Sequence, residues 1–332
     1  MIVNGKTSEW VKVKSGVPEG ALLAPLLFSM FINDLPTVVV SSKCIMYADD
    51  VKIYRQISST ADCEPLQADL SNLCKWSADW QLTLNPQKCV AFTITLKQTP
   101  VLHTYCINSS PLQRVTEVRD LGVILDSKLT FSAHIDSMVT KGNRALGLLI
   151  RSFKTGLPRQ KFDRKALLVA YYANVRSILE YGSVVWSGAA KTHLKRLERV
   201  QHKFLVWLAA RARDTDRLAG LEYRNLLNSF HVPSLEARRV QADLVYLRKI
   251  VSGKTDYSFL LSCFSLHIPR RPTRNNSMFN VPFARVSTVK MGTFVRLVTL
   301  ANAFILKNPQ VDFFVDGFVI FKSSVLAYVA NM

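Results

Sequence analysis

The chain has 332 residues, of which 48% are hydrophobic and 20% are charged. Its length suits about two domains, and its composition excludes a disordered, collagen-like or mucin-like chain. The 43 Lys and Arg side chains outnumber the 24 Asp and Glu side chains, and the net charge of +19 favours a polyanionic partner over a merely soluble basic surface.

The excess positive charge lies in the second half of the chain. Residues 1–150 hold 14 basic and 13 acidic side chains, a net charge of +1, whereas residues 151–332 hold 29 basic and 11 acidic side chains, a net charge of +18. A field of this sign and size favours nucleic acid as the partner, and less often an anionic membrane surface.

The first predicted element is a hairpin. Ile2-Val3 predicts a strand that enters a turn at Asn4-Gly5, with the partner strand at residues 10–13. Residues 22–35 then predict a buried helix that ends before Pro36.

Two adjacent carboxylates lie at the tip of the next hairpin. Strands are predicted at residues 38–40, 43–47 and 51–54, and Asp49 and Asp50 fall between the last two. Carboxylates on a rigid turn are the hard ligands that Mg²⁺ or Mn²⁺ requires. A solvated turn is the alternative, although the apolar strands around the pair are a costly setting for unpaired charge.

The elements that follow change from mixed to helical. Residues 62–81 have the apolar period of a helix, and residues 90–96 and 118–125 are strand-like, so residues 1–125 predict an α+β layer of strands with helices between them. Further helices are predicted at residues 166–178, 192–208 and 234–250, the last with Ser234 as its N-cap and Gly253 just past its end.

Tyr47-Ala48-Asp49-Asp50 follows a motif at residues 16–35 that begins with Gly-Val-Pro-Glu-Gly-Ala. The two resemble the catalytic box, and the box that precedes it, of reverse transcriptases from jockey-like retrotransposons that lack long terminal repeats. Leu84-Asn85-Pro86-Gln87-Lys88-Cys89 and residues 120–135, which begin with Asp-Leu-Gly-Val-Ile-Leu-Asp, resemble the next boxes in the correct order. The resemblance covers about residues 1–140.

This resemblance implies the α+β fold of a right-hand polymerase. Residues 1–125 would form a partial palm with the end of the fingers, residues 126–215 a helical thumb-like region, and residues 216–332 a basic, mostly helical extension. The implied activity is RNA-directed DNA polymerisation, with Mg²⁺ or Mn²⁺ as the cofactor. The implied partners are an RNA template, a DNA primer, their RNA–DNA duplex and deoxynucleoside triphosphates.

The resemblance also implies roles for single residues. Asp49 would be the direct metal ligand with Asp50 as its neighbour, and Tyr47 and Ala48 would line the nucleotide and the primer end. Lys88 would steady or protonate the leaving pyrophosphate, although a surface Lys at a turn explains it equally well.

Two further motifs are implied to contact the substrates. Gly16, Pro18, Glu19 and Gly20 would contact the nucleotide or primer. Leu121-Gly122 resembles the primer grip, where glycine permits close approach of the backbone to the nucleic acid.

The sequence departs from the family in ways that bear on activity. Glu19 stands where the family usually has Gln, and Ala21 where it usually has Ser. The upstream strand that bears another metal-bridging carboxylate is missing, and Glu9 is the sole acid before Gly16. We therefore expect an amino-terminally truncated, carboxyl-terminal portion of a polymerase that holds metal weakly and is inactive alone. The alternative is a non-catalytic, basic nucleic-acid-binding remnant of a decayed element.

The segment at residues 192–213 combines an apolar face with a basic one. Packing explains the apolar face, which consists of Leu194, Leu197, Val200, Phe204 and Leu208. The basic face is opposed only by Glu198, and given the family it suits contact with the phosphates of a template–primer duplex, with a solvated surface as the alternative. Its cations are Lys195, Arg196, Arg199, Lys203 and Arg211. Cations that extend it less specifically are Arg238, Arg239, Arg248, Lys249, Arg270, Arg271 and Arg274.

The sequence predicts neither a zinc site nor a membrane span. No two cysteines have the Cys-x-x-Cys spacing, and the first twenty residues lack the apolar core of a signal peptide. The most apolar late stretch, residues 311–320, is interrupted by Asp312 and Asp316. We expect an intracellular protein of the cytoplasm or nucleus.

Overall fold

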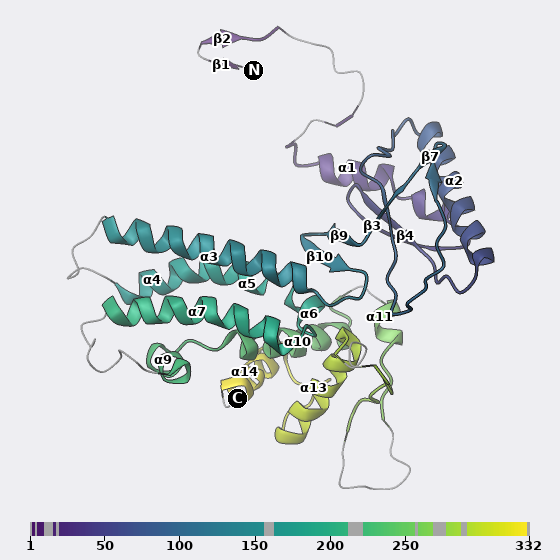
Figure 1. The fold of residues 1–332 in the computed structure, drawn as a ribbon. Helices are drawn as coiled ribbons and strands as arrows, with labels where there is room; N and C mark the ends of the chain where they lie inside the picture. Colours follow the sequence, from purple (N-terminus) through teal and green to yellow (C-terminus); the bar gives the residue numbers. More distant parts are fainter. Residues whose placement is uncertain are drawn as a thin grey trace. The chain divides into compact units, whose positions relative to one another are not determined.

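A computed structural model describes residues 2–3, 5–9, 16–17, 20–155, 163–211, 222–255, 258–267, 277–286 and 291–330. The chain divides into two compact units, Met1–Thr116 and Glu117–Met332, which we call the first and second units. Helices and strands are mixed, as an α+β chain requires, with short strands in the first unit and long helices in the second (Figure 1).

The first unit contains short two-stranded sheets and two α-helices. Its strands are β1 (Ile2–Val3), β2 (Lys6–Thr7), β3 (Lys43–Tyr47), β4 (Asp50–Tyr54), β5 (Val90–Phe92), β6 (Cys106–Ile107), β7 (Ser110–Pro111) and β8 (Gln113–Val115). Its helices are α1 (Ala24–Phe31), α2 (Cys63–Asp79) and the 3₁₀ turns Leu35–Val38 and Thr60–Asp62. Strands β3 and β4 pair antiparallel, as the sequence predicts, whereas β5 and β8 pair parallel.

Alternate side chains of the β3–β4 hairpin pack on a small hydrophobic core in the first unit. Cys44 and Met46 of β3 pack on this core, whereas Ile45 and Tyr47 point to the other face and are exposed. Trp76 of α2 is buried in the same core. Helix α2 therefore supports one face of the hairpin.

A buried carboxylate of α2 also holds the segment that leads into β3. Asp69 is 1% exposed, and its Oδ1 accepts hydrogen bonds from the backbone N–H groups of Val40 at 2.9 Å and Ser41 at 3.2 Å. Burial would raise the pKa of this carboxyl, but the hydrogen bonds that it accepts lower the pKa below its usual value. Asp69 is therefore stabilised as an anion that anchors the hairpin.

The helix expected at residues 22–35 is shorter than predicted, and the prediction that it is buried was wrong. Helix α1 ends at Phe31, and Pro36 lies within the 3₁₀ turn that follows. Leu22 is 95% exposed and Met30 68% exposed, because among the described residues no second layer covers this side of α1. The same 3₁₀ turn replaces part of the strand expected at residues 38–40.

Two other strand predictions also need correction. Residues 118–125 form a hairpin rather than one strand: β9 (Glu117–Asp120) pairs antiparallel with β10 (Val123–Asp126). At the amino terminus β1 pairs with β2 instead of residues 10–13, which lie outside the described residues.

The second unit is built from the β9–β10 hairpin and a series of helices. These are α3 (Ser132–Thr155), α4 (Arg164–Tyr171), the π-helical turn Tyr172–Arg176, α5 (Ser177–Glu180), α6 (Ser183–Trp186), α7 (Lys191–Arg211), α9 (Tyr223–Phe230), α10 (Leu235–Val251), α11 (Ser258–Ser262), α13 (Thr293–Lys307) and α14 (Phe318–Ala330). The three helices predicted from the apolar period are confirmed, and the Ser234 hydroxyl accepts the predicted capping bond from the Ala237 N–H at 3.1 Å.

Two hydrophobic cores stabilise the second unit. The first lies among α3, α4, α5, α7 and α9, where α3 and α7 run side by side (Figure 1). Within it the Tyr171 ring stacks on Phe204, with ring centres 4.1 Å apart. The second core lies among α10, α13 and α14. No helix in the described part of the chain is long and apolar enough to cross a membrane.

A buried ion pair links α13 to α10. Arg296 of α13 donates from Nε to Asp243 Oδ2 of α10 at 2.8 Å, and their side chains are 9% and 2% exposed. Burial raises the pKa of Asp243, and the neighbouring Arg296 opposes this rise. Arg296 also donates to the Val184 carbonyl oxygen of α6, so three helices meet at its guanidinium.

The carboxylate of Asp126 organises the turn between β10 and α3. It accepts hydrogen bonds from the N–H groups of Lys128 at 3.1 Å, Thr130 at 3.0 Å and Phe131 at 2.7 Å. Burial would raise the pKa of Asp126, but these hydrogen bonds outweigh burial and lower the pKa.

Removal of the buried carboxylate is expected to destabilise the protein strongly. Asp243→Ala leaves the Arg296 guanidinium buried without its counter-ion, which costs about 3–5 kcal/mol of unfolding free energy. The matched control is Asp136→Ala at the exposed Arg196–Asp136 pair, with an expected cost of about 1 kcal/mol or less. Urea unfolding of both variants measures the difference, and equal losses would contradict the assignment.

Acid is expected to reduce the contribution of Asp126 to stability. Because its pKa is lower in the folded than in the unfolded chain, the contribution is full above the unfolded value of about 3.9 and disappears as the pH falls through the folded value. Asp126→Asn should therefore be less stable than the wild type at neutral pH, with a gap that narrows as the pH falls below about 5. Urea midpoints across this pH range measure the gap, and a constant gap would refute the assignment.

Candidate functional site

The Asp49–Asp50 pair lies at the tip of the β3–β4 hairpin. Tyr47 pairs with Asp50 across the two strands, so Ala48 and Asp49 form a two-residue loop. Ala48 has a φ of 51°, a left-handed conformation that costs a non-glycine residue roughly 1 kcal/mol. A positive φ at the first residue matches the tight two-residue turns that join antiparallel strands.

The tip is open to solvent. Tyr47 is 64% exposed, and Ala48, Asp49 and Asp50 are exposed as well. The two carboxylates are therefore accessible to a ligand without movement of the hairpin, and their hairpin is anchored from behind by α2.

The ligand atoms at the tip are of the kind that a divalent ion prefers, but there are too few of them. Asp49 and Asp50 offer hard carboxylate oxygens. No group of three or more His, Cys, Asp or Glu side chains with the geometry of a metal site occurs among the described residues. The described residues alone therefore do not provide the donors that a two-metal site requires.

The glycines of the preceding box are exposed and adopt conformations that suit glycine. Gly16 has a φ of 89° and Gly20 a φ of 79°, and a Cβ at either position would meet no atom within 4 Å. Their conformation, rather than crowding, explains the residue type. Pro18 and Glu19 lie outside the described residues.

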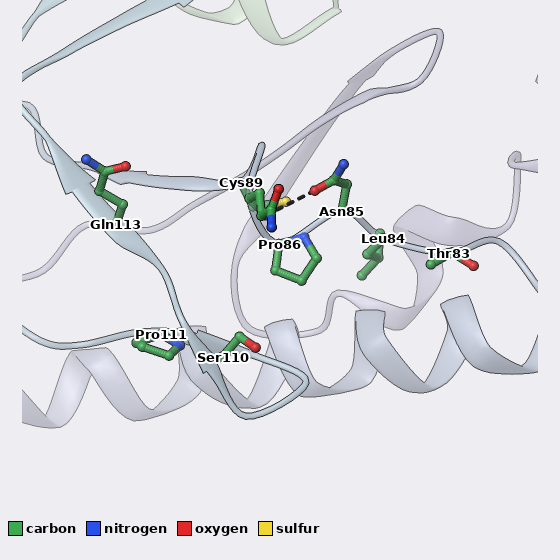
Figure 2. Close-up of a pocket in the computed structure, with 9 residues that line it drawn as sticks. Thr83, Leu84, Asn85, Pro86, Cys89, Ser110, Pro111 and Gln113 are labelled. Carbon is green, nitrogen blue, oxygen red and sulfur yellow. Dashed lines mark hydrogen bonds between the residues drawn. The ribbon is translucent and has the colours of Figure 1, made fainter.

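Lys88 lies in a turn beside a pocket that the sequence did not reveal. Its backbone N–H donates to the Asn85 carbonyl oxygen at 3.1 Å, and its side chain is exposed. The pocket has a volume of about 810 Å³ and lies between the loop that carries Asn85, Pro86 and Cys89 and the strands that carry Pro111 and Gln113 (Figure 2). Its nine lining residues are all uncharged, which does not suit a triphosphate.

Leu121-Gly122 forms the tip of the β9–β10 hairpin in the second unit. Both residues have positive φ, 43° and 87°, and both are exposed. Such angles match the tight two-residue turn that joins antiparallel strands. The side chain beneath this turn belongs to Tyr181, a residue that no sequence motif indicated.

The apolar and basic faces predicted for α7 are confirmed. Leu197, Val200, Phe204 and Leu208 are at most 1% exposed, and Leu194 is half-buried. On the other side the cations differ in their partners.

Lys195 and Arg199 are exposed and, among the described residues, form no hydrogen bond or ion pair with another side chain. Arg196 forms an ion pair with Asp136 of α3, and Lys203 donates to Asn143 Oδ1 of α3 at 3.1 Å. We call Lys195 and Arg199 the basic face of α7.

Glu198 does not oppose the basic face, as the sequence had suggested, because its carboxylate points into the protein. Its Oε2 accepts from the Tyr223 hydroxyl at 2.6 Å and the Leu235 N–H at 3.2 Å, and its Oε1 accepts from the Glu236 N–H at 2.6 Å. The carboxylate is thus used at the start of α10 and does not pair with Lys195 or Arg199.

The expected extension of the basic face to α10 is wrong for its arginines. Arg238 forms an ion pair with Glu180, and Arg239 is 5% exposed with its Nη2 3.7 Å from Glu198 Oε1. Helix α10 packs against α6, α7, α13 and α14, so its arginines are enclosed rather than presented to solvent.

Arg248 follows the same pattern. It is 5% exposed, and its Nη2 donates to the carbonyl oxygens of Phe314 at 3.0 Å and Asp316 at 2.7 Å. Lys249 is exposed. The other predicted cations, Arg270, Arg271 and Arg274, lie outside the described residues.

Comparison with known proteins identifies relatives of the chain. Residues 1–125 match the family described as reverse transcriptase (RNA-dependent DNA polymerase). The chain is 28% identical over 198 residues to the probable RNA-directed DNA polymerase from transposon X-element of Drosophila melanogaster, an alignment that covers 58% of this chain and 21% of that protein.

Two polymerases of the mobile element jockey are similar as well. The chain is 30% identical over 210 residues to the one from Drosophila funebris, which covers 58% of this chain and 22% of that protein. It is 29% identical over 232 residues to the one from Drosophila melanogaster, which covers 65% of this chain and 24% of that protein.

The chain spans between 21% and 24% of the length of these curated relatives. No solved structure matches it significantly. The resemblance inferred from the motifs is confirmed: residues 1–125 match the reverse transcriptase family, and the chain is similar to the polymerases of jockey and X-element.

Proposed function

We propose that this chain is part of an RNA-directed DNA polymerase that extends a DNA primer along an RNA template. Residues 1–125 supply part of the palm and the end of the fingers, residues 126–215 a thumb-like helical region, and residues 216–332 a basic extension. The family match of residues 1–125 supports the first assignment. The helices α3 to α7 support the second.

The observation that carries this proposal is the exposed carboxylate pair at the β3–β4 tip. Asp49 and Asp50 lie at the end of a hairpin that α2 anchors, within the segment that matches the family. A divalent ion bound there would stabilise negative charge on the triphosphate and lower the pKa of the primer hydroxyl. Tyr47 and Ala48 flank the carboxylates and would contact the nucleotide and primer end.

The number of carboxylates limits what this chain does alone. Asp49 and Asp50 lack a third metal-binding partner among the described residues, and ion affinity follows the number of anionic oxygens. We propose that Mg²⁺ or Mn²⁺ binds weakly at the tip and that the chain alone does not polymerise. Lys88 at the pyrophosphate and residues 16–20 at the nucleotide remain assignments by resemblance.

The basic face of α7 is the proposed contact with the nucleic-acid backbone. Lys195 and Arg199 are exposed, and Glu198 between them is occupied at the start of α10. Lys or Arg side chains on an exposed helix face neutralise phosphates irrespective of base sequence. Arg196 and Lys203 would add positive charge to this surface, but their bonds to α3 restrict how far their side chains can extend to a phosphate.

The second candidate function is nucleic-acid binding without catalysis. It is favoured by one observation: the described residues hold two metal-binding carboxylates without a third, whereas the basic face of α7 needs no further group to bind phosphate. The two candidates differ in what the tip does, so metal binding and nucleotide incorporation separate them.

Weak binding of Mn²⁺ without nucleotide incorporation is expected. Electron paramagnetic resonance of Mn²⁺ should show binding in roughly the millimolar range, because two carboxylates hold the ion. Asp49→Asn with Asp50→Asn should abolish this binding, whereas the control Asp79→Asn, an exposed carboxylate at the end of α2, should not.

Primer extension on an RNA template completes this test. We expect no incorporation by the chain in Mg²⁺ or Mn²⁺. Incorporation that Asp49→Ala abolishes would show a complete site and would rule out the non-catalytic candidate. Mn²⁺ binding that is absent, or that survives loss of both carboxylates, would contradict the proposed polymerase site.

The affinity for an RNA–DNA duplex is expected to fall as the salt concentration rises. This fall should be less steep in a variant that lacks the basic face of α7. Each lost phosphate contact reduces the slope of log K against log salt by about 0.9, so Lys195→Ala with Arg199→Ala should reduce it by roughly 2. The control with the same change in charge is Lys307→Ala with Lys322→Ala on α13 and α14. Equal slopes in both double variants would exclude a specific role for α7.

A further inference from the structure

The tip of the β9–β10 hairpin is held by a side chain from the helical part of the chain. The Tyr181 hydroxyl donates a hydrogen bond to the Leu121 carbonyl oxygen at 2.8 Å, across a sequence separation of 60 residues. Tyr181 follows α5 and lies 56 residues beyond the last residue that matches the reverse transcriptase family, residue 125.

The ring of Tyr181 packs against the second residue of the turn. A Cβ at Gly122 would lie 3.1 Å from Tyr181 Cε1 and 3.6 Å from Cζ, and Gly122 has a φ of 87°. Two observations therefore favour glycine at position 122: its positive φ and the close approach of the Tyr181 ring. The hydroxyl and the ring together fix both residues of the turn.

Tyr181 is itself held from behind. The indole N–H of Trp186, which is fully buried, donates to the Tyr181 carbonyl oxygen at 2.8 Å. The next residue, Gly182, has a φ of 63°, and a Cβ there would lie 3.2 Å from Val123 Cγ2 of β10. The helical layer thus supports the tyrosine and the hairpin together.

A second contact fixes the far side of the hairpin. The Ile124 N–H of β10 donates to His134 Nδ1 of α3 at 3.3 Å, and His134 is 3% exposed. Burial lowers the pKa of His134, and the nearby positive charges of Lys141 and Arg119 lower it further. The hairpin is therefore docked on a buried, neutral histidine.

We propose that Tyr181 is a positioning residue that holds the Leu121-Gly122 turn in the shape that contacts the primer end. This inference rests on the proposed function and on the resemblance of Leu121-Gly122 to the primer grip. Tyr181 is 56% exposed and Leu121 43% exposed, so the bond between them lies at the surface, where a ligand can reach the turn.

The position of the bond favours a role in shaping the turn over a role in global stability. A hairpin with a two-residue turn closes through its own strand pairing and needs no outside donor. The net effect of one exposed hydrogen bond is a factor of about five in an equilibrium. Such a factor is small for the folding of the whole unit but large for the fraction of time that an exposed turn holds one shape.

The test uses the full chain and an RNA template annealed to a DNA primer. The primer carries 2-aminopurine either at its 3′ terminus or at an internal site, so that fluorescence reports on the primer end and on the duplex separately. Tyr181→Phe removes only the hydroxyl, and Tyr181→Leu also removes the ring. The control is Tyr172→Phe, a half-buried tyrosine whose ring lies against Arg176 in the same unit.

Both Tyr181 variants are expected to bind the duplex with an affinity within about twofold of the wild type, because the phosphate contacts lie elsewhere. The fluorescence change at the 3′ terminus on binding should fall in Tyr181→Phe and fall further in Tyr181→Leu. The internal probe should respond as in the wild type. Tyr172→Phe should change neither signal. Hydrogen exchange of residues 117–126 should be faster in the Tyr181 variants alone.

The possible failures are distinguishable. If Tyr181→Phe leaves the terminal signal unchanged, or changes the terminal and internal signals equally, the positioning role is overturned while duplex binding stands. If the wild type binds no duplex, both this inference and the nucleic-acid part of the proposed function are overturned. If the Lys195 and Arg199 variant binds normally but the terminal signal still depends on Tyr181, only the assignment of the backbone contact fails. Tyr181→Phe decides the matter even if Tyr181→Leu does not fold.

Discussion

The inward carboxylate of Glu198 is the interaction on which the helical unit and its charged surface both depend. It accepts the Tyr223 hydroxyl of α9 and the Leu235 N–H at the start of α10, and so joins three helices at one point. A carboxylate at a helix amino terminus is also stabilised by the helix dipole. Since this charge is used inside, the Glu198 carboxylate does not pair with Lys195 or Arg199. The orientation of this one side chain thus affects both the contacts between helices and the charge that α7 presents.

At the β3–β4 hairpin, the first unit has one carboxylate that points inward and two that point outward. Asp69 is consumed in anchoring the segment before β3, whereas Asp49 and Asp50 remain exposed at the other end of the hairpin. An anchored hairpin with a solvated tip can hold metal ligands in a fixed position. The affinity for the metal ion still depends on the number of carboxylate oxygens that bind it. The constraint on catalysis is therefore the number of donors rather than the shape of the hairpin.

Local patterns predicted the parts of the structure that local forces decide. The β3–β4 hairpin, the α7 faces and the Ser234 cap depend on residues close in sequence and were foreseen. The exposure of α1 and the burial of Arg239 depend on which elements cover them, and the alternation or period of a segment carries no such information. The contact of Tyr181 with the Leu121 turn spans 60 residues, so no motif marked it.

The β9–β10 hairpin shows that a family segment and a physical unit need not share a boundary. The family match runs to residue 125, yet the hairpin belongs to the compact unit that begins at Glu117. Val123 is buried in the helical core, and His134 and Tyr181 bond to the hairpin backbone. The shape of the turn is therefore a property of the helices as well as of its own motif. It follows that substitutions in α5 or α6 can alter the shape of a turn that lies within the matched segment.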